Sequence, residues 1–312
     1  MIDLLSYGAF FLSTALILGI MTLGLNLQWG LTGLFNVGIA GFVAIGAYTS
    51  GILTSPEAAD RIGGFGWPIL AGWLAAMAMA GAAAALTGVV TLRLKADYLA
   101  ITTFGVAVVV QLIALNAQGL TGGPFGVAFI PRPFAALADQ PVLFNFLNLG
   151  VVLAVTLVVY LALEHLARSP WGRVLRALRE DERAAISLGK SARSYRVQAF
   201  AVGGAVMGLA GALQAHFIGF IAPGNYLPTL TFQIWAMLMV GGSGSNRGAL
   251  AGTLVVWAIW VGAGAVTSSL VPTDLQARTA ALQIVAIGVM LCVILLLRPQ
   301  GFLGERRRKA ME

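Results

Sequence analysis

"QAFAVGGAVMGLAGALQAHFIG", residues 198–219, is long enough to cross a membrane and contains no Asp, Glu, Lys or Arg. A spanning helix needs about 20 mostly apolar residues. Gly204, Gly208 and Ala212 recur along it at four-residue spacing, followed at the same spacing by His216, and Gly211, Ala215 and Gly219 form a second stripe of small residues. Because small residues let helices approach closely in lipid, the stretch predicts a tight helix–helix contact, and lining of a pore is the less favoured alternative.

The composition of the whole chain agrees with a membrane location. Of its 312 residues 59% are hydrophobic and only 10% are charged, whereas soluble domains carry about 25% charged residues. We therefore expect an all-α integral membrane protein. The single cysteine, Cys292, excludes a disulfide framework, and His165 and His216 lack the spacing of a metal site.

The apolar stretches predict a polytopic helix bundle with about nine (8–10) transmembrane segments. They lie near 5–27, 31–53, 66–92, 97–117, 142–164, 198–219, 229–242, 248–271 and 279–297. The second is interrupted by glycines and Asn36, and the seventh is short, so either could be re-entrant or discontinuous. Neither a basic start nor a cleavage site marks the first segment as a signal peptide. We expect one membrane domain over 1–304 and a basic cytoplasmic tail over 305–312.

Basic residues predict the orientation. Of the 19 Lys and Arg residues, only Arg61, Arg132 and Arg278 fall in one set of alternating loops, and the other set holds the rest. Since basic loops stay in the cytoplasm, the N-terminus is expected outside and the C-terminus inside. This placement explains the formal charge of +7 by membrane orientation, and binding of nucleic acid is not expected.

The loop 165–197 is the largest charged feature. Ser169 can cap a helix, Pro170 suits its first turn, and Gly189 suits the position after its end, so one amphipathic helix is predicted over 170–189. Three consecutive acids, Glu180 to Glu182, would be repelled by anionic lipid. Docking into a protein groove is therefore favoured over a helix that lies on the lipid surface.

Gly189, Lys190 and Ser191 match the end of the phosphate-loop pattern G-x-x-x-x-G-K-[ST]. The first glycine of that pattern falls on Ala184. A phosphate loop follows a strand and opens a helix, whereas Gly189 is expected to end one. The sequence therefore argues against ATP binding at this site.

With these features in place, "GRVLRALREDERAAISLG" (172–189) resembles the cytoplasmic coupling loop of permeases in ATP-binding-cassette importers. The resemblance is greatest to permeases for branched-chain amino acids, of the second type that pairs with a homologous sister permease. It extends over about 24–304, through "RLKADYLAITTFG" (93–105), "LTGGPFG" (120–126), "GLAGALQAHFIGFIAPGNY" (208–226), "MVGGSGSNRGALAG" (239–252) and "LRPQGFLG" (297–304).

The resemblance implies a translocation subunit of the bacterial inner membrane, without catalytic residues or a cofactor. Two cytoplasmic ATPase subunits would bind ATP, and a second homologous permease, an extracytoplasmic solute-binding protein and membrane lipid would be the other partners. The helix would seat in an ATPase groove, with Val174, Leu178, Ala185 and Leu188 supplying burial. The expected docking residues are Arg179, Glu180, Asp181, Glu182, Ala184, Ala185, Leu188 and Gly189.

Candidates for the translocation path or gate are Asn36, Thr121, Gly122, Gly123 and Asn225. Asn36 lies in "LFNVGIA" (34–40), where relatives often carry a polar "SLGHA"-like stretch, so the cargo could be urea or another small amide instead of a branched-chain or related small amino acid. A buried amide must pair with a helix or face a wet path. The loop "LTGGPFG" could contact a binding protein, form an outer gate or simply be ordered.

The acids Asp97 and Glu164 lie at span ends, and none lies convincingly at mid-membrane. Ion-coupled carriers usually need an ionisable or coordinating site at depth, so a secondary transporter or channel is the less favoured alternative. An intramembrane enzyme ranks below both, because no constellation of catalytic residues is visible.

Overall fold

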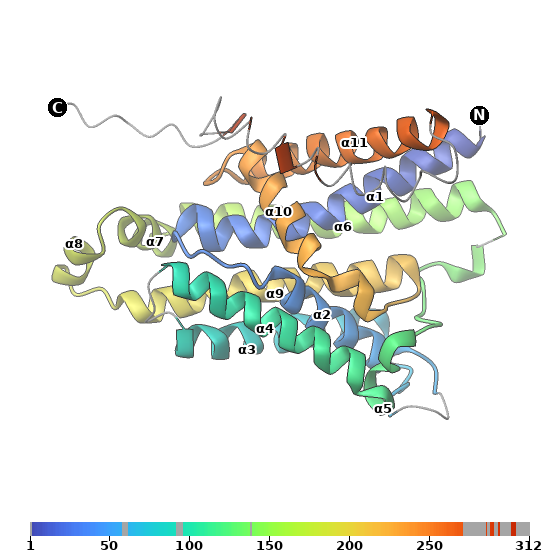
Figure 1. The fold of residues 1–312 in the computed structure, drawn as a ribbon, viewed down its shortest axis with the longest axis horizontal. Helices are drawn as coiled ribbons and strands as arrows, with labels where there is room; N and C mark the ends of the chain where they lie inside the picture. The colour runs from blue at the N-terminus through green and yellow to red at the C-terminus, as the bar shows by residue number, and fades with distance from the viewer. Residues whose placement is uncertain are drawn as a thin grey trace.

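The protein is built of long helices that run roughly parallel to a common axis (Figure 1). The structure is a computed structural model, and it describes residues 2–57, 62–91, 96–137, 139–270, 285, 288–289, 293 and 301–303. The long helices are α1 (Ile2–Leu25), α3 (Ile69–Thr91), α4 (Ala96–Asn116), α6 (Pro141–Arg168), α9 (Ala192–Ile218) and α11 (Asn246–Leu270). Shorter ones are α2 (Ile39–Thr54), α5 (Gln118–Thr121), α7 (Pro170–Glu180), α8 (Glu182–Ser187) and α10 (Pro228–Gly241). Single turns are η2 (Gly123–Phe125), η3 (Ala135–Leu137) and η4 (Pro223–Tyr226).

Six helices in the described part of the chain are long and apolar enough to cross a membrane, and α2 and α10 are shorter apolar helices. This confirms a multi-pass, all-α membrane protein. The structure describes the predicted span 279–297 only at positions 285, 288–289 and 293. Cys292 and the tail 305–312 lie outside the described residues.

The two weak spans are indeed irregular. After Leu25 the first helix continues as a π-helix, η1 (Asn26–Leu31), and residues 33–38 are non-helical before α2 begins. Gly33 has a φ of +72°, a backbone conformation that residues with a Cβ rarely adopt. The predicted span 31–53 is therefore a break followed by a short helix, and 229–242 is the short helix α10.

Tight helix packing along α9 follows the stripes of small residues. A Cβ added to Gly46 on α2 would lie 2.1 Å from the backbone oxygen of Gly208, and one added to Gly211 would lie 2.1 Å from that of Val43. On another side of α9, a Cβ on Gly204 would lie 2.3 Å from the Cβ of Ala84. The predicted close contact is confirmed, because only glycine allows these approaches.

Burial separates central from peripheral helices. In the apolar windows of α1 and α9, 67% and 72% of residues are buried, against 22–28% in α3, α4, α6 and α11. The helices α1 and α9 therefore form the centre of the described bundle. The other four present exposed apolar side chains such as Val158 and Leu161, as expected of surfaces that face lipid.

Candidate functional site

Residues 170–189 form two helices, so the prediction of one continuous helix was wrong. The start was predicted correctly, since the Oγ of Ser169 accepts a hydrogen bond from the Gly172 N–H at 3.3 Å and Pro170 opens α7. At Asp181 the backbone is extended, with φ −146° and ψ 101°. Its Oδ1 accepts a hydrogen bond from the Ala184 N–H at 3.0 Å, which caps α8. We call residues 170–189 the elbow.

The second half of the elbow is fastened to α9. The Nη1 and Nη2 atoms of Arg196 donate to the Oε1 and Oε2 atoms of Glu182, both at 2.9 Å. Next to this ion pair lies a small apolar cluster of Leu178, Ala185 and Ala192, with Val174 and Tyr195 packed against it. Part of the apolar face expected to enter a partner's groove is therefore already buried in the chain itself.

The first half of the elbow is fastened to the end of the first membrane helix. The Nη1 of Arg179 donates to the backbone oxygen of Gly30 in η1. Trp171, at the start of α7, donates from Nε1 to the Oε1 of Gln198 on α9 at 2.9 Å. The elbow is thus connected to both central helices, and Figure 1 shows α7 and α8 at one end of the bundle.

The exposed residues of the elbow form one candidate surface for a partner. Leu188 is 81% exposed and Ile186 is 50% exposed, so two large apolar side chains close together in the sequence are accessible to a partner. The exposed residues between positions 180 and 188 are Glu180, Asp181, Arg183, Ala184, Ile186, Ser187 and Leu188, and we call this set the elbow surface. Gly189 is also exposed, whereas Arg179 and Glu182 are half-buried and paired and Ala185 is buried.

The Gly-Lys-Ser tripeptide connects two helices. Gly189 follows α8 with a φ of +76°, as expected, but the Oγ of Ser191 accepts a hydrogen bond from the Ser194 N–H and caps α9. The tripeptide thus precedes a helix, contrary to expectation. It follows a helix where a phosphate loop follows a strand, and Ala184 belongs to α8, so the local structure is not that of a phosphate loop.

Asn36 lies in the break between η1 and α2 and is fully buried. Its Nδ2 donates to the Oε1 of Gln28 at 2.7 Å, and its Oδ1 accepts a hydrogen bond from the Gly38 N–H at 2.7 Å. Gln28 in turn donates to the backbone oxygen of Phe200 on α9 at 2.9 Å. Of the two alternatives for Asn36, the structure shows hydrogen bonding within the bundle.

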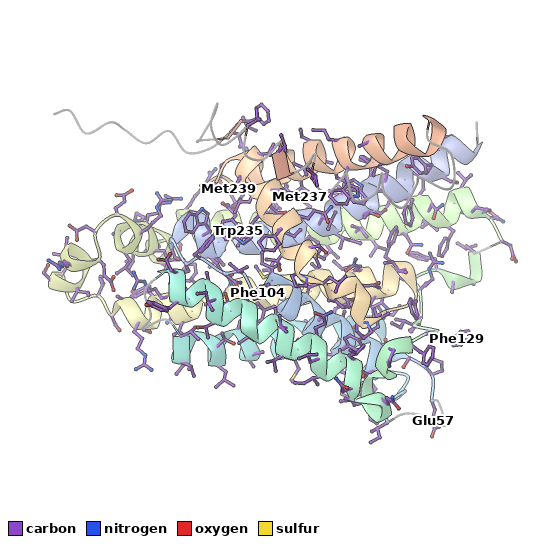
Figure 2. All side chains as sticks on the ribbon, viewed as in Figure 1. Glu57, Phe104, Phe129, Trp235, Met237 and Met239 are labelled. Atoms are coloured by element: carbon purple, nitrogen blue, oxygen red, sulfur yellow. The ribbon has the colours of Figure 1, made fainter. Side chains whose placement is uncertain are left out.

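An aromatic side chain from α10 completes the contacts of the break. The Nε1 of Trp235 donates to the backbone oxygen of Asn36 at 2.9 Å, and the Trp235 ring packs against Trp29 and Phe35. Figure 2 shows Trp235 on α10, well away from Phe129 and Glu57 at the other end of the molecule. The break therefore joins α1, α2, α9 and α10.

The predicted outer loop is compact and tied to the segment after α9. Gly122 has a φ of +73°, and a Cβ there would lie 1.9 Å from the Gly126 backbone oxygen. The Oγ1 of Thr121 donates to the Ala114 backbone oxygen at 2.7 Å. Val127 and Ile221 exchange backbone hydrogen bonds at 2.8 and 3.0 Å.

The five path candidates are not assembled into one site. Thr121, Gly122 and Gly123 belong to the compact loop after α4, and Asn225 is an exposed residue of η4, which follows Ile221. Asn36 belongs to the break beside Trp235. Further along the same connection, burial lowers the pKa of Arg132, whose guanidinium lies 4.7 Å from the centre of the Phe144 ring.

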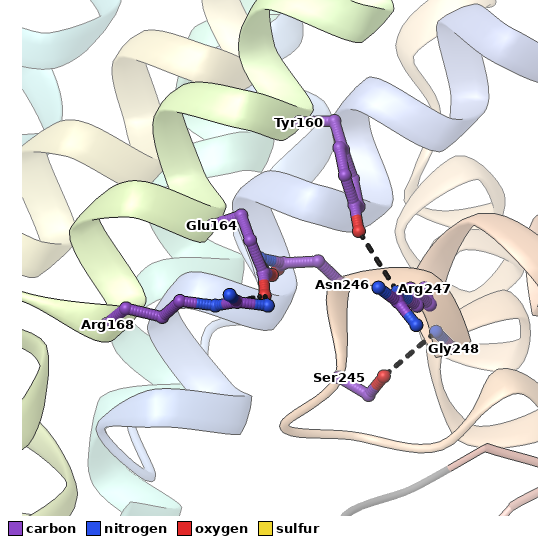
Figure 3. Close-up of polar contacts among 7 residues, drawn as sticks. All are labelled: Tyr160, Glu164, Arg168, Ser245, Asn246, Arg247 and Gly248. Atoms are coloured by element: carbon purple, nitrogen blue, oxygen red, sulfur yellow. Dashed lines mark hydrogen bonds and ion pairs between the residues drawn. The ribbon is translucent and has the colours of Figure 1, made fainter.

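A polar network near the elbow joins α6, α11 and η1, and Figure 3 shows the part of it on α6 and α11. The two carboxylate oxygens of Glu164 accept hydrogen bonds from the Nε of Arg168 and from the Nδ2 of Asn246, both at 2.9 Å. The Oδ1 of Asn246 accepts from the Nδ2 of Asn26 at 2.9 Å, and the Oδ1 of Asn26 accepts from the Gly244 N–H at 2.8 Å. The network fixes three chain segments at this end of the bundle.

Sequence reasoning missed this network. It placed Glu164 at a span end and singled out 239–252 as a motif, but it did not connect them. Polar residues at three span ends on the predicted cytoplasmic side, Asn26, Glu164 and Asn246, were the available signal. A pairing across 82 residues has no periodic pattern from which the partners could be read.

The chain is similar to known proteins over most of its length. Residues 8–295 match the family described as branched-chain amino acid transport system / permease component. The chain is 32% identical to the high-affinity branched-chain amino acid transport system permease protein LivM of Escherichia coli K12, over 92% of this chain and 68% of that protein. It is 33% identical to LivM of Salmonella typhimurium LT2, with the same coverage.

A more distant relative is the probable branched-chain amino acid transport permease protein LivM of Methanocaldococcus jannaschii. It is 26% identical over 92% of this chain and 90% of its own length. No solved structure matches the chain.

Proposed function

Since the chain belongs to the family of branched-chain amino acid transport permeases, we propose that it is the membrane-spanning translocation subunit of an ATP-driven importer. Its cargo would be a branched-chain or related small amino acid carried into the cytoplasm. The chain would catalyse no reaction and hold no cofactor, because separate subunits would bind and hydrolyse ATP.

One structural observation carries this proposal: the elbow is held by the membrane bundle and also presents exposed apolar side chains. Arg179 connects it to Gly30, and Glu182 connects it to Arg196 on α9. Leu188 and Ile186 remain exposed beside the acids Glu180 and Asp181. A mixed-charge surface with apolar centres fits a protein groove, and we assign that groove to a cytoplasmic ATPase subunit.

The connections of the elbow suggest how its movement would reach the transport path. A partner that displaces the elbow surface would move α7 and α8 together, because the buried cluster and the Glu182–Arg196 pair join them to the start of α9. The displacement would reach Gly30 through Arg179. Gly30 lies close before the break that contains Asn36, so we propose that this break rearranges when the path opens and closes.

The other partners follow from the same assignment. A homologous second permease would complete the path, two ATPase subunits would seat on the paired elbows, and an extracytoplasmic solute-binding protein would deliver cargo. The chain would lie in the bacterial inner membrane with its N-terminus outside, because most basic residues then face the cytoplasm. The elbow end of the bundle in Figure 1 would be the cytoplasmic end.

Reconstitution tests the proposal. Proteoliposomes that contain this chain, the second permease, the two ATPase subunits and the solute-binding protein should take up labelled leucine only when ATP is supplied. A matched preparation whose ATPase subunits lack the phosphate-loop lysine should not. Uptake by this chain alone under a proton or sodium gradient would contradict the importer role. ATP-dependent uptake of urea without leucine would contradict the substrate class and leave the importer role intact.

A further inference from the structure

The connections at the end of the bundle opposite the elbow expose large apolar side chains. Two segments contribute, residues 62–68 before α3 and residues 117–129 after α4, and they meet where the Ile62 N–H donates to the Gly119 backbone oxygen at 2.6 Å. Phe125 is 86% exposed and Phe129 is 83% exposed, and Figure 2 shows Phe129 at this end. We call the exposed large apolar residues of the two segments the far-end set, and it comprises Ile62, Phe65, Trp67, Leu120, Phe125 and Phe129.

Both segments lack charged side chains. The sequence contains no Asp, Glu, Lys or Arg from 62 to 92 or from 98 to 131. Glu57 is exposed at the same end of the molecule, but it precedes the first segment (Figure 2). Loops that face water are usually polar. The composition of the two segments is therefore that of the neighbouring membrane helices, continued past the helix ends.

The backbone of the two segments is bonded within the protein at many positions. A loop in water can leave its N–H groups to the solvent, whereas a loop in an apolar layer must pair them with other protein groups. In the first segment the amides of Ile62, Gly64, Gly66 and Trp67 donate to backbone oxygens at 2.6–3.3 Å. In the second segment the amides of Leu120, Thr121, Gly122, Gly126 and Val127 do so at 2.8–3.1 Å. This pairing suits a position next to lipid.

Phe129 is held in a strained conformation with its ring exposed. Its φ is +57°, which a bulky side chain rarely adopts. The residues around it are fixed, because Val127 and Ile130 are buried and donate to the backbone oxygens of Ile221 and Gly219. A ring that is 83% exposed adds little packing within the chain to offset the strain. A contact outside the chain is therefore indicated.

We propose that the far-end set lies in the boundary layer of the membrane, where the acyl chains of the phospholipids meet the headgroups. Interfacial segments bury Trp, Phe and Leu side chains in that layer. The set also continues an apolar surface, because Leu70 on α3 is 68% exposed and Ile113 on α4 is 56% exposed. A soluble protein is the less suited partner, since uncharged segments offer no charge pairing to steer it or fix its register.

Spin labels in the full-length chain test the proposal. The chain has a single cysteine, so Cys292→Ser provides a background for Phe125→Cys and Phe129→Cys. Each labelled chain is reconstituted into vesicles of phosphatidylethanolamine and phosphatidylglycerol, and the access of oxygen is compared with that of a polar nickel chelate. Leu157→Cys on α6 is the lipid reference, because Leu157 is 54% exposed on an apolar helix. Glu180→Cys in the elbow is the water reference, because the Glu180 side chain is 73% exposed.

We expect the ratio of oxygen access to chelate access at positions 125 and 129 to resemble that at 157. It should exceed the ratio at 180 about tenfold, because an apolar layer excludes a polar solute. The proposal is overturned if the chelate reaches either label as it reaches position 180. It is also overturned if neither reagent reaches the labels, because protein would then cover them.

A further arm adds the solute-binding protein to the same vesicles. Labels that the chelate reaches at first and that become protected only with this protein would assign the far-end set to a protein partner and overturn the lipid contact. Labels that resemble position 157 before and after the addition support it. The measurement on the chain alone needs no transport, so its result is independent of whether the importer role holds.

Discussion

Glu182 and Arg196 form a bidentate ion pair, with both nitrogen–oxygen distances at 2.9 Å. The pair joins the short helix α8 to the start of α9, a central helix of the bundle. A six-residue helix is too short to be stable alone, so α8 depends on such tertiary contacts. Glu182 is therefore a structural support of the elbow surface and is only partly available to a partner.

Glu182→Gln should loosen α8 without unfolding the bundle. The Glu182 side chain is 43% exposed, so solvent screens the pair and its loss should cost only about 0.5–1 kcal/mol. Hydrogen exchange should show faster exchange of the amides of residues 182–187, by about two- to fivefold. Glu180→Gln is the matched control, because the Glu180 side chain is 73% exposed, and it should leave those rates unchanged. Equal rates in the two variants would show that the ion pair does not hold α8.

Leu188→Glu should block ATPase docking while leaving the membrane bundle intact. The side chain is 81% exposed, so the new carboxylate costs the isolated chain little, but it would be buried in an apolar groove on the partner. Co-purification of the ATPase subunits and ATP-dependent uptake should both fall at least tenfold. Leu188→Met keeps the apolar contact and should behave as the wild type. Normal co-purification with Leu188→Glu would remove this residue from the docking surface.

Asn36→Ala should destabilise the bundle at the break. The change leaves the Oε1 of Gln28 and the Gly38 N–H without their partner in a fully buried place. Each orphaned buried group costs about 1–3 kcal/mol, so the thermal midpoint followed by tryptophan fluorescence should drop clearly. Asn225→Ala removes the same side chain from an exposed turn and should stay within about 0.5 kcal/mol. Equal midpoints for the two variants would contradict the structural role of Asn36.

Gly46→Ala should force α2 and α9 apart. The added Cβ would lie 2.1 Å from the backbone oxygen of Gly208 and 2.4 Å from its Cα, and backbone atoms cannot move aside as a side chain can. Overpacking of this kind costs about 1–3 kcal/mol, so the yield of monodisperse protein should fall. Gly105→Ala on α4 meets nothing within 4 Å and should be neutral or slightly stabilising. A monodisperse Gly46→Ala protein with unchanged thermal midpoint would mean that the helices are not in close contact.

The parts of the fold that could be predicted are those with a local signal. The stripes through Gly204 and Gly211 indicated close packing, because glycine at helical spacing in an apolar run has few other uses. Glycines and Asn36 indicated the irregular second span. Ser169 and Pro170 indicated where α7 begins, since caps act through neighbouring backbone groups.

The parts that could not be predicted depend on contacts between distant segments. Asp181 could lie on the surface of one continuous helix or cap a second helix. In the structure Asp181 caps α8, and Glu182 pairs with Arg196. Nothing in residues 170–189 alone decides between these. The link from Glu164 through Asn246 to Asn26 likewise needs three segments in register. Which side of the elbow is exposed also follows from tertiary burial, so Ala185 was expected at a partner surface but is buried.

We propose that the elbow surface touches an ATPase subunit in the assembled transporter. Photo-cross-linking in native membranes tests it, with a benzophenone amino acid placed at position 188. Position 153 is the control, because Leu153 is 53% exposed on α6, a helix long and apolar enough to cross a membrane. We predict an adduct between this chain and the ATPase subunit from position 188 and none from position 153. An actively transporting complex that yields no ATPase adduct from position 188 would show that the elbow surface does not touch the ATPase subunit.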